Sequence, residues 1–295
     1  ERLWKQLVLT GGSDGPAARS RRDLAVMVGC ALGAAVSVRA PELFGVSLAE
    51  GSGFYPLNAG LLVLPWLAGF LAWRRGAPAR LVGVLVALFA VGAVAANAYP
   101  LSVESQSIVL TSLHLPLALW FAVGLAYASD DPRSSRRWMD FIRFTGEWVV
   151  YMVLLALGGG VLIGLTVGTF NALGMDPEWF IAEWVAPMGA AGAVLVAAWL
   201  VEAKQNVVEN IAPVLTRVFT PLTNVMMLAL LGAFTPIRSF TAVDRDLLIL
   251  MDLVLVLVLG LLLYAISARD PQARPGAFEW LQLVLVVSAV VVDLL

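Results

Sequence analysis

The stretch Leu247–Leu263 reads LLILMDLVLVLVLGLLL, and a run of this kind decides the fold. Asp252 is its only charged residue, and mostly apolar residues continue to position 268. A helix of about 20 apolar residues crosses the roughly 30 Å of hydrocarbon in a bilayer. The run therefore predicts a transmembrane helix.

Eight further stretches share this character, and the whole chain is correspondingly apolar. Of its 295 residues, 60% are hydrophobic and 14% are charged, and the mean hydropathy is +0.86. A soluble domain is roughly 45–50% apolar and about 25% charged. The fold class predicted is all-α, a polytopic transmembrane bundle of about nine helices. The nine stretches are 24–38, 56–73, 81–99, 108–128, 148–173, 180–201, 218–234, 247–268 and 278–295.

The basic residues indicate the orientation, because cytoplasmic loops of membrane proteins carry an excess of Lys and Arg. With the N-terminus in the cytoplasm, all but three of the 19 basic residues lie on the inner side. The exceptions are Arg39, Arg238 and Arg245. We therefore expect a cytoplasmic N-terminus and a multi-pass protein of the bacterial inner (cytoplasmic) membrane, with the lipid bilayer around it.

One longer polar connection, 129–146, divides the chain and is rich in Asp, Arg and Ser. We expect a cytoplasmic N-terminal segment at 1–23, a four-helix membrane subdomain at 24–128, a cytoplasmic loop at 129–146 and a five-helix membrane subdomain at 147–295. The last apolar run has no closing polar flank before Leu295. The second subdomain is therefore expected to be truncated at its C-terminal end.

Asp252 is the first residue to consider for function, because charged groups in hydrocarbon are costly. It follows Asp246 by six residues, which places it about 9 Å further along the helix, in the outer leaflet. A carboxylate in this position suits proton relay or cation binding. The alternative is a structural ion pair with Arg238 or Arg245.

A second polar cluster covers 202–210, at the predicted cytoplasmic end of the sixth helix. On a helix, Glu202, Asn206 and Glu209 share one face. Their oxygens could line the inner mouth of a pathway and bind a cation, and the alternative is a solvated extension of the helix. The candidate polar pathway or ion site thus comprises Glu202, Asn206, Glu209, Asn210 and Asp252.

Small and amide side chains within the runs point to helix packing. Gly160, Gly164 and Gly168 repeat every four residues in the fifth stretch, and small residues at this spacing let helix backbones approach closely. Lone amides in membrane helices usually form hydrogen bonds between helices. We expect this role for three residues, Asn58, Asn97 and Asn224.

Several classes of function have no support in the residues. There is no HExxH, no Gly-x-Ser-x-Gly, no paired aspartates at the spacing of intramembrane proteases and no pair of histidines for haem. One cysteine and one histidine do not build the usual thiolate or imidazole metal sites. No basic stripe interleaved with aromatic residues suggests nucleic acid. We expect no enzyme activity, no cofactor, no metal and no nucleic-acid partner.

Four short motifs give the second half of the chain a family likeness: Gly146-Glu147-Trp148, the glycine-rich 158–168, the run 206–213 (NVVENIAP) and Phe219-Thr220-Pro221-Leu222. On these motifs, residues 141–295 resemble an uncharacterised group of bacterial multi-pass membrane proteins, the domain-of-unknown-function family 4153. The resemblance implies a membrane fold that continues beyond this chain, and it implies no particular activity. It favours Glu209 and Asn210 over Asp252 as functional residues.

Together these observations predict a permease-like or channel-like protein for a small solute or ion. The alternative is a non-transporting membrane scaffold, a sensor or a subunit of a membrane complex, with partner membrane subunits or as a homo-oligomer. Copurification in mild detergent discriminates between these two functions.

Overall fold

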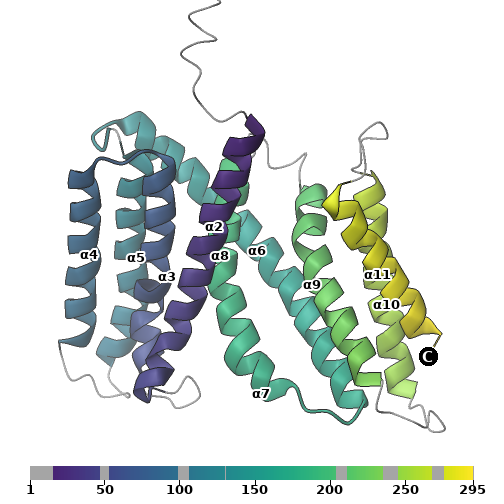
Figure 1. The fold of residues 1–295 in the computed structure, drawn as a ribbon. Coiled ribbons are helices and arrows are strands. Elements are labelled where there is room, and N and C mark those ends of the chain that lie inside the picture. Colours follow the sequence, from purple (N-terminus) through teal and green to yellow (C-terminus); the bar gives the residue numbers. More distant parts are fainter. Residues whose placement is uncertain are drawn as a thin grey trace, which may run out of the picture. The chain divides into compact units, whose positions relative to one another are not determined.

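The computed structural model describes residues 16–46, 53–98, 106–129, 131–203, 211–234, 245–267 and 276–294. Within these ranges the chain is helical and contains no β-strand, which confirms the predicted fold class (Figure 1). The described part of the chain contains nine long helices and three short helical segments, η1 (Ala40–Phe44), α7 (Glu178–Phe180) and η2 (Ile181–Val185). The long helices are α2 (Pro16–Arg39), α3 (Phe54–Arg74), α4 (Ala79–Asn97), α5 (Gln106–Ala128), α6 (Ser135–Ala172), α8 (Ala186–Ala203), α9 (Ile211–Phe234), α10 (Arg245–Ser267) and α11 (Ala277–Asp293).

In the described ranges, eight helices are long and apolar enough to cross a bilayer. The first of these candidate spans covers Arg22–Phe44, 23 residues, so the short apolar run at 24–38 belongs to a helix of full spanning length. The helix α11 has 17 residues, at the lower end of the roughly 17–25 residues that span a bilayer.

The helix α6 departs from the predicted domain organisation. Residues 129–146 were predicted as a loop, and the described part of this range, 129 and 131–146, forms a short turn and then the beginning of a helix of 38 residues. Trp138 and Phe141 explain the difference, because both rings lie against Gly124 of α5, where an added Cβ would be 2.8 Å from each. Of the charges that suggested a loop, Asp140 lies between these two aromatic residues, and Arg136, Arg137 and Arg143 flank them along the helix. At 1.5 Å per residue, α6 is about 57 Å long, nearly twice the hydrocarbon thickness.

The chain folds into two compact units. The first comprises Glu1–Ile142 and Val194–Trp199, and the second comprises Arg143–Ala193 and Leu200–Leu295. The division falls inside 129–146, within the helix α6.

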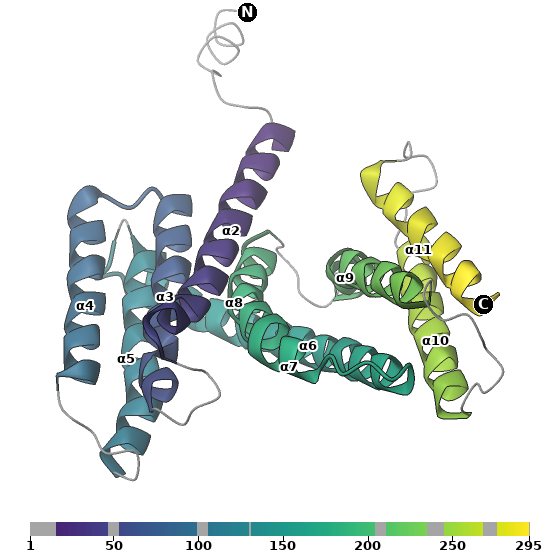
Figure 2. The same cartoon turned by 60° about the horizontal axis from the view of Figure 1, so that its bottom comes forward.

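In the first unit, α3 is the central helix and contacts α2, α4 and α5 (Figure 2). Leu67, Phe70 and Leu71 of α3 are completely buried. The ring of Trp66 lies against Gly33 of α2, where an added Cβ would be 2.5 Å from the ring. Burial of these large side chains and the close approach at Gly33 hold α2 and α3 together.

Polar side chains also join helices of the first unit. Asn58 Nδ2 on α3 donates a hydrogen bond to Asn97 Oδ1 on α4 at 3.1 Å, and Asn97 Nδ2 donates to Asn58 Oδ1 at 2.8 Å. Arg74 of α3 forms a salt bridge of 2.8 Å with Asp23 of α2. The reciprocal amide pair confirms the interhelical role predicted for Asn58 and Asn97.

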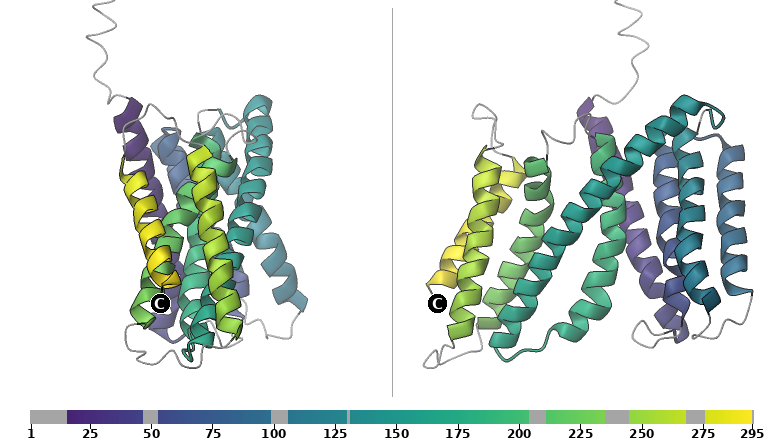
Figure 3. Two further views of the ribbon diagram at one scale, coloured as in Figure 1. Left: turned by 90° about the vertical axis from the view of Figure 1, so that its right-hand side faces the viewer. Right: turned by 180° about the vertical axis from the view of Figure 1, so that it is seen from behind.

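In the second unit, α9 packs against α10 and α11, which also contact each other (Figure 3). Asn224 Nδ2 of α9 donates a hydrogen bond to the backbone carbonyl of Leu281 on α11 at 3.0 Å, which confirms the third amide prediction. The helix α6 approaches α10 where an added Cβ at Gly168 would be 3.0 Å from Leu250. This unit contains the candidate functional site.

Candidate functional site

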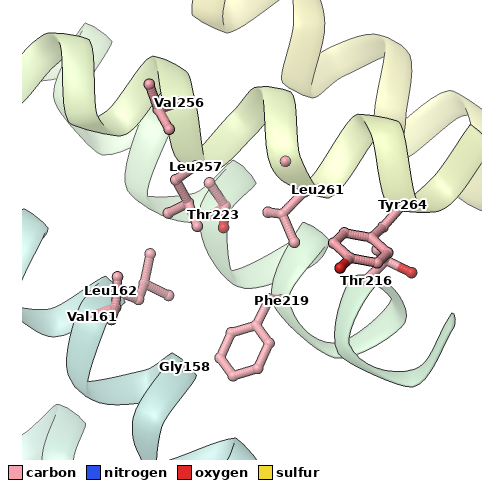
Figure 4. A pocket seen from close by; sticks show the side chains of 11 residues that line it. Gly158, Val161, Leu162, Thr216, Phe219, Thr223, Val256, Leu257, Leu261 and Tyr264 are labelled. Carbon is pink, nitrogen blue, oxygen red and sulfur yellow. The ribbon is translucent and has the colours of Figure 1, made fainter. Parts of the chain in front are cut away.

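A cavity of about 440 Å³ lies between α6, α9 and α10 (Figure 4). Sites for small molecules typically measure about 300–1,000 Å³, so the cavity is large enough for one. Its lining is mostly apolar, and three of the lining residues carry hydroxyl groups. The lining residues are Gly158, Val161, Leu162, Thr216, Phe219, Thr223, Val256, Leu257, Gly260, Leu261 and Tyr264.

Two glycines shape this cavity. Gly158 of α6 lies against the ring of Phe219 on α9, and an added Cβ would be only 2.4 Å from that ring. The aromatic ring can therefore occupy its present position only because residue 158 has no side chain. Gly260 of α10 is different, because an added Cβ would meet no described atom within 4 Å. The missing side chain at Gly260 leaves open space in the cavity.

Thr223 supplies a buried hydroxyl without a hydrogen-bond partner. Its side chain has no exposed surface, and Oγ1 has no partner within the described part of the chain. Two threonines of α6 behave differently, because Thr166 and Thr169 each donate to the carbonyl oxygen four residues earlier at 2.7 Å. Buried polar atoms in proteins are nearly always paired, so the unpaired Thr223 hydroxyl marks this cavity as a candidate binding site.

The same stretch of α9 contains further buried polar atoms without hydrogen-bond partners among the described residues. Thr220 Oγ1 and Asn224 Oδ1 are buried without a hydrogen-bond partner among the described residues. Pro221 lacks an N–H, which removes the hydrogen bond to the carbonyl four residues earlier. Several unpaired buried groups within two turns of α9 distinguish this stretch from ordinary helix packing, in which such groups are satisfied.

Asp252 does not line the cavity, and it lies on α10 one helical turn before the lining residue Val256. Its side chain is exposed, and in the described ranges it forms neither an ion pair nor a hydrogen bond. The structural ion pair with Arg245 is therefore not formed. Arg238, the other predicted partner, lies outside the described residues.

The predicted polar wall is described only in part. Glu202 is half-buried in the last turn of α8. Asn206, Glu209 and Asn210 lie outside the described residues. Of the two predicted site residues that the structure describes, Asp252 is one helical turn from a lining residue of the cavity, and Glu202 is not on a helix that lines it.

The predicted glycine stripe meets a neighbouring helix at one of its three positions. Gly168 lies against α10, whereas an added Cβ at Gly160 or Gly164 would meet no described atom within 4 Å. The helix α6 contacts the Phe219 ring of α9 at Gly158, which is not part of the stripe. The stripe of Gly160, Gly164 and Gly168 therefore does not make both contacts, because the contact with α9 is at Gly158 and the contact with α10 is at Gly168.

Metal-binding groups do not come together in the described ranges, where no three His, Cys, Asp or Glu side chains could hold an ion. The lone histidine, His114, has its Nδ1 2.8 Å from the carbonyl oxygen of Leu110 in its own helix. The imidazole therefore has a hydrogen-bond partner within its own helix.

The cavity residues of α9 were missed in the sequence, although a signal for them is present. Thr216, Thr220 and Thr223 are spaced by four and three residues, which places them on one face of a helix that is mostly apolar apart from Arg217 and Asn224. Asn224 adjoins this face. A hydroxyl-bearing face without charges indicates a site for a mostly apolar molecule more directly than a lone carboxylate does.

No protein-family model matches the chain, and no curated protein or solved structure matches it. The class of protein follows from the helices, which make the chain a multi-pass membrane protein. The likeness of residues 141–295 to an uncharacterised bacterial family stays a prediction.

Proposed function

We propose that this protein is a permease-like protein of the bacterial inner membrane for a small amphipathic solute, whose apolar part occupies the cavity between α6, α9 and α10. The observation that carries this proposal is the buried Thr223 hydroxyl, which has no partner in the described ranges and lines an apolar cavity of about 440 Å³. One free hydroxyl in an apolar site can orient a molecule that is itself mostly apolar.

A bare inorganic ion fits this cavity poorly. Its lining residues include no carboxylate and no amide side chain, and an ion without ligands pays a large desolvation cost. The polar clusters in the sequence suggested an ion as the solute. The cavity instead favours a small organic molecule.

The helix α9 supports movement of the solute through the membrane. Pro221 interrupts its backbone hydrogen bonding between the cavity residues Phe219 and Thr223. Transporters commonly build their solute sites beside interrupted helices. Bending at Pro221 would change the cavity on one side.

Uptake into proteoliposomes tests this function. We would use three radiolabelled probes that share a phenylethyl body: 2-phenylethyl-trimethylammonium, 3-phenylpropionate and 2-phenylethyl glucoside. We expect protein-dependent uptake of at least one probe. Uptake of all three at the rate of protein-free liposomes would contradict the proposal.

Two matched glycine variants assign the uptake to the cavity. Gly260→Leu places a side chain in the open space of the cavity, and Gly164→Leu places the same side chain in open space on α6, outside the lining. We expect Gly260→Leu to abolish uptake and Gly164→Leu to preserve it. Equal loss in both variants would show that the cavity is not the route.

A non-transporting subunit of a membrane complex is the second candidate, and one observation favours it. Gly160 and Gly164 lie one turn apart on α6 with no described atom within 4 Å of an added Cβ. Such a surface admits the close approach of a partner helix. A stoichiometric partner that copurifies in mild detergent and is lost from the Gly164→Leu protein would support this function.

A further inference from the structure

We infer that the solute of this cavity is an amphipathic cation, whose positive group lies at Asp252 while its apolar body lies against Thr223 and Phe219. This inference rests on the proposed function. It adds the charge of the solute, which the cavity alone does not determine.

The position of Asp252 supports the inference. Asp252, Val256 and Gly260 follow one another at intervals of four residues, so they share one face of α10, and the last two line the cavity. Side chains four residues apart on a helix are neighbours, with Cβ atoms about 5–6 Å apart. A molecule in the cavity can therefore reach the Asp252 carboxylate with a short extension past Val256.

The surroundings of Asp252 leave its charge available. The side chain is exposed and forms no ion pair or hydrogen bond in the described part of the chain. A carboxylate at hydrocarbon depth is costly without a partner. A cationic group brought in by the solute would supply that partner in a medium of low dielectric constant, where the attraction is stronger than in water.

The cavity offers no partner for a negatively charged solute, because none of its lining residues is basic. Arg217 of α9 is the neighbour of the lining residue Thr216 and is exposed. Preference for an anionic solute would assign the recognition to Arg217 and would overturn the inference.

Equilibrium binding to the full chain in lipid nanodiscs tests the charge preference with the same three phenylethyl probes. We expect 2-phenylethyl-trimethylammonium to bind more tightly than 3-phenylpropionate and 2-phenylethyl glucoside. Asp252→Asn should weaken binding of the cation about tenfold, which corresponds to one partly desolvated ion pair, and should leave binding of the glucoside unchanged. Asp252→Glu should bind the cation as tightly as the natural protein does, because it keeps the carboxylate.

Asp293 provides the matched control, because it is an exposed carboxylate near the end of α11 and does not line the cavity. Asp293→Asn should leave binding of the cation unchanged. Equal weakening of cation binding by both asparagine variants would attribute the effect to the general charge of the membrane surface and overturn the inference.

Tyr264→Leu is the second comparison, because an aromatic ring also attracts a quaternary ammonium. Loss of the cation in Tyr264→Leu but not in Asp252→Asn would place the charge at the other end of the cavity and overturn the inference.

The outcomes separate the inference from the proposed function. Uptake of the glucoside that Gly260→Leu abolishes, together with a cation affinity that Asp252→Asn does not change, would leave the permease-like function standing and remove the cationic solute. Absence of uptake and of binding for all three probes would remove both.

Discussion

Phe219 of α9 lies directly against Gly158 of α6, so closely that a Cβ added at Gly158 would be 2.4 Å from the ring. Phe219 is buried and lines the cavity. This contact joins α6 to the group formed by α9, α10 and α11, and it also positions the aromatic wall of the candidate site.

Gly158→Ala should lower the thermal stability of the purified protein. Overpacking typically costs about 1–3 kcal/mol, and the better helix propensity of alanine returns up to about 1 kcal/mol, so we expect a net loss of about 1 kcal/mol. Gly164→Ala has open space around its new methyl group and should be neutral or slightly stabilising. If the Gly158→Ala protein were as stable as the Gly164→Ala protein, the Phe219 ring could move away from the new methyl group without loss of stability.

The fit of Gly158 to Phe219 can be isolated by a second substitution. Phe219→Leu shortens the side chain and should relieve the overpacking, so Gly158→Ala should cost less in the Phe219→Leu background than in the natural protein. The double-mutant cycle measures this coupling. Strictly additive effects would indicate that the two residues do not contact each other.

The amide pair Asn58 and Asn97 should couple α3 to α4. Asn58→Leu leaves the Asn97 amide without its interhelical partner and should destabilise the first unit by about 0.6 kcal/mol, the average for hydrogen bonds in a membrane bundle, and by no more than about 1.7 kcal/mol. Unfolding in mixed micelles of increasing denaturing detergent gives the stability. The double variant Asn58→Leu/Asn97→Leu should lose less than the sum of the two single variants, because it leaves no buried amide unpaired. Additive losses would contradict the pairing.

The predicted orientation places Gly76, between α3 and α4, in the cytoplasm and Gly174, between α6 and α7, outside. After Cys30 has been replaced by alanine, a membrane-impermeant maleimide applied to intact cells should label Gly174→Cys and spare Gly76→Cys. Both positions should react once the membrane is opened. The reverse pattern in intact cells would invert the topology.

The sequence predicted the fold well because long apolar runs leave few alternatives in a membrane, where helices satisfy their own backbone. It failed at 129–146, because the arginines and aspartates there suggested a loop. Trp138 and Phe141 instead pack against Gly124 and extend α6 through the charged segment. Local charge patterns cannot reveal such a tertiary contact.

The candidate site was only partly predictable for a related reason. Asp252 was identified because a charge in an apolar run is conspicuous. Thr216, Phe219 and Thr223 are unremarkable in sequence, and they acquire a role only where α6 and α10 leave a space beside α9. Gly158 was seen as part of a glycine-rich segment, but its contact with Phe219 depends on how α6 crosses α9.

Thr223→Val tests the central claim most directly, because it removes the cavity hydroxyl and preserves the shape of the side chain. We expect binding of the phenylethyl probe that the natural protein takes up to weaken about fivefold to tenfold, the value of one hydrogen bond, without loss of thermal stability, since Thr223 Oγ1 has no partner among the described residues. The matched control is Thr169→Val, whose buried hydroxyl already donates to the Leu165 carbonyl, and it should leave probe binding unchanged. Unchanged binding in Thr223→Val would contradict the assignment of the solute to this cavity.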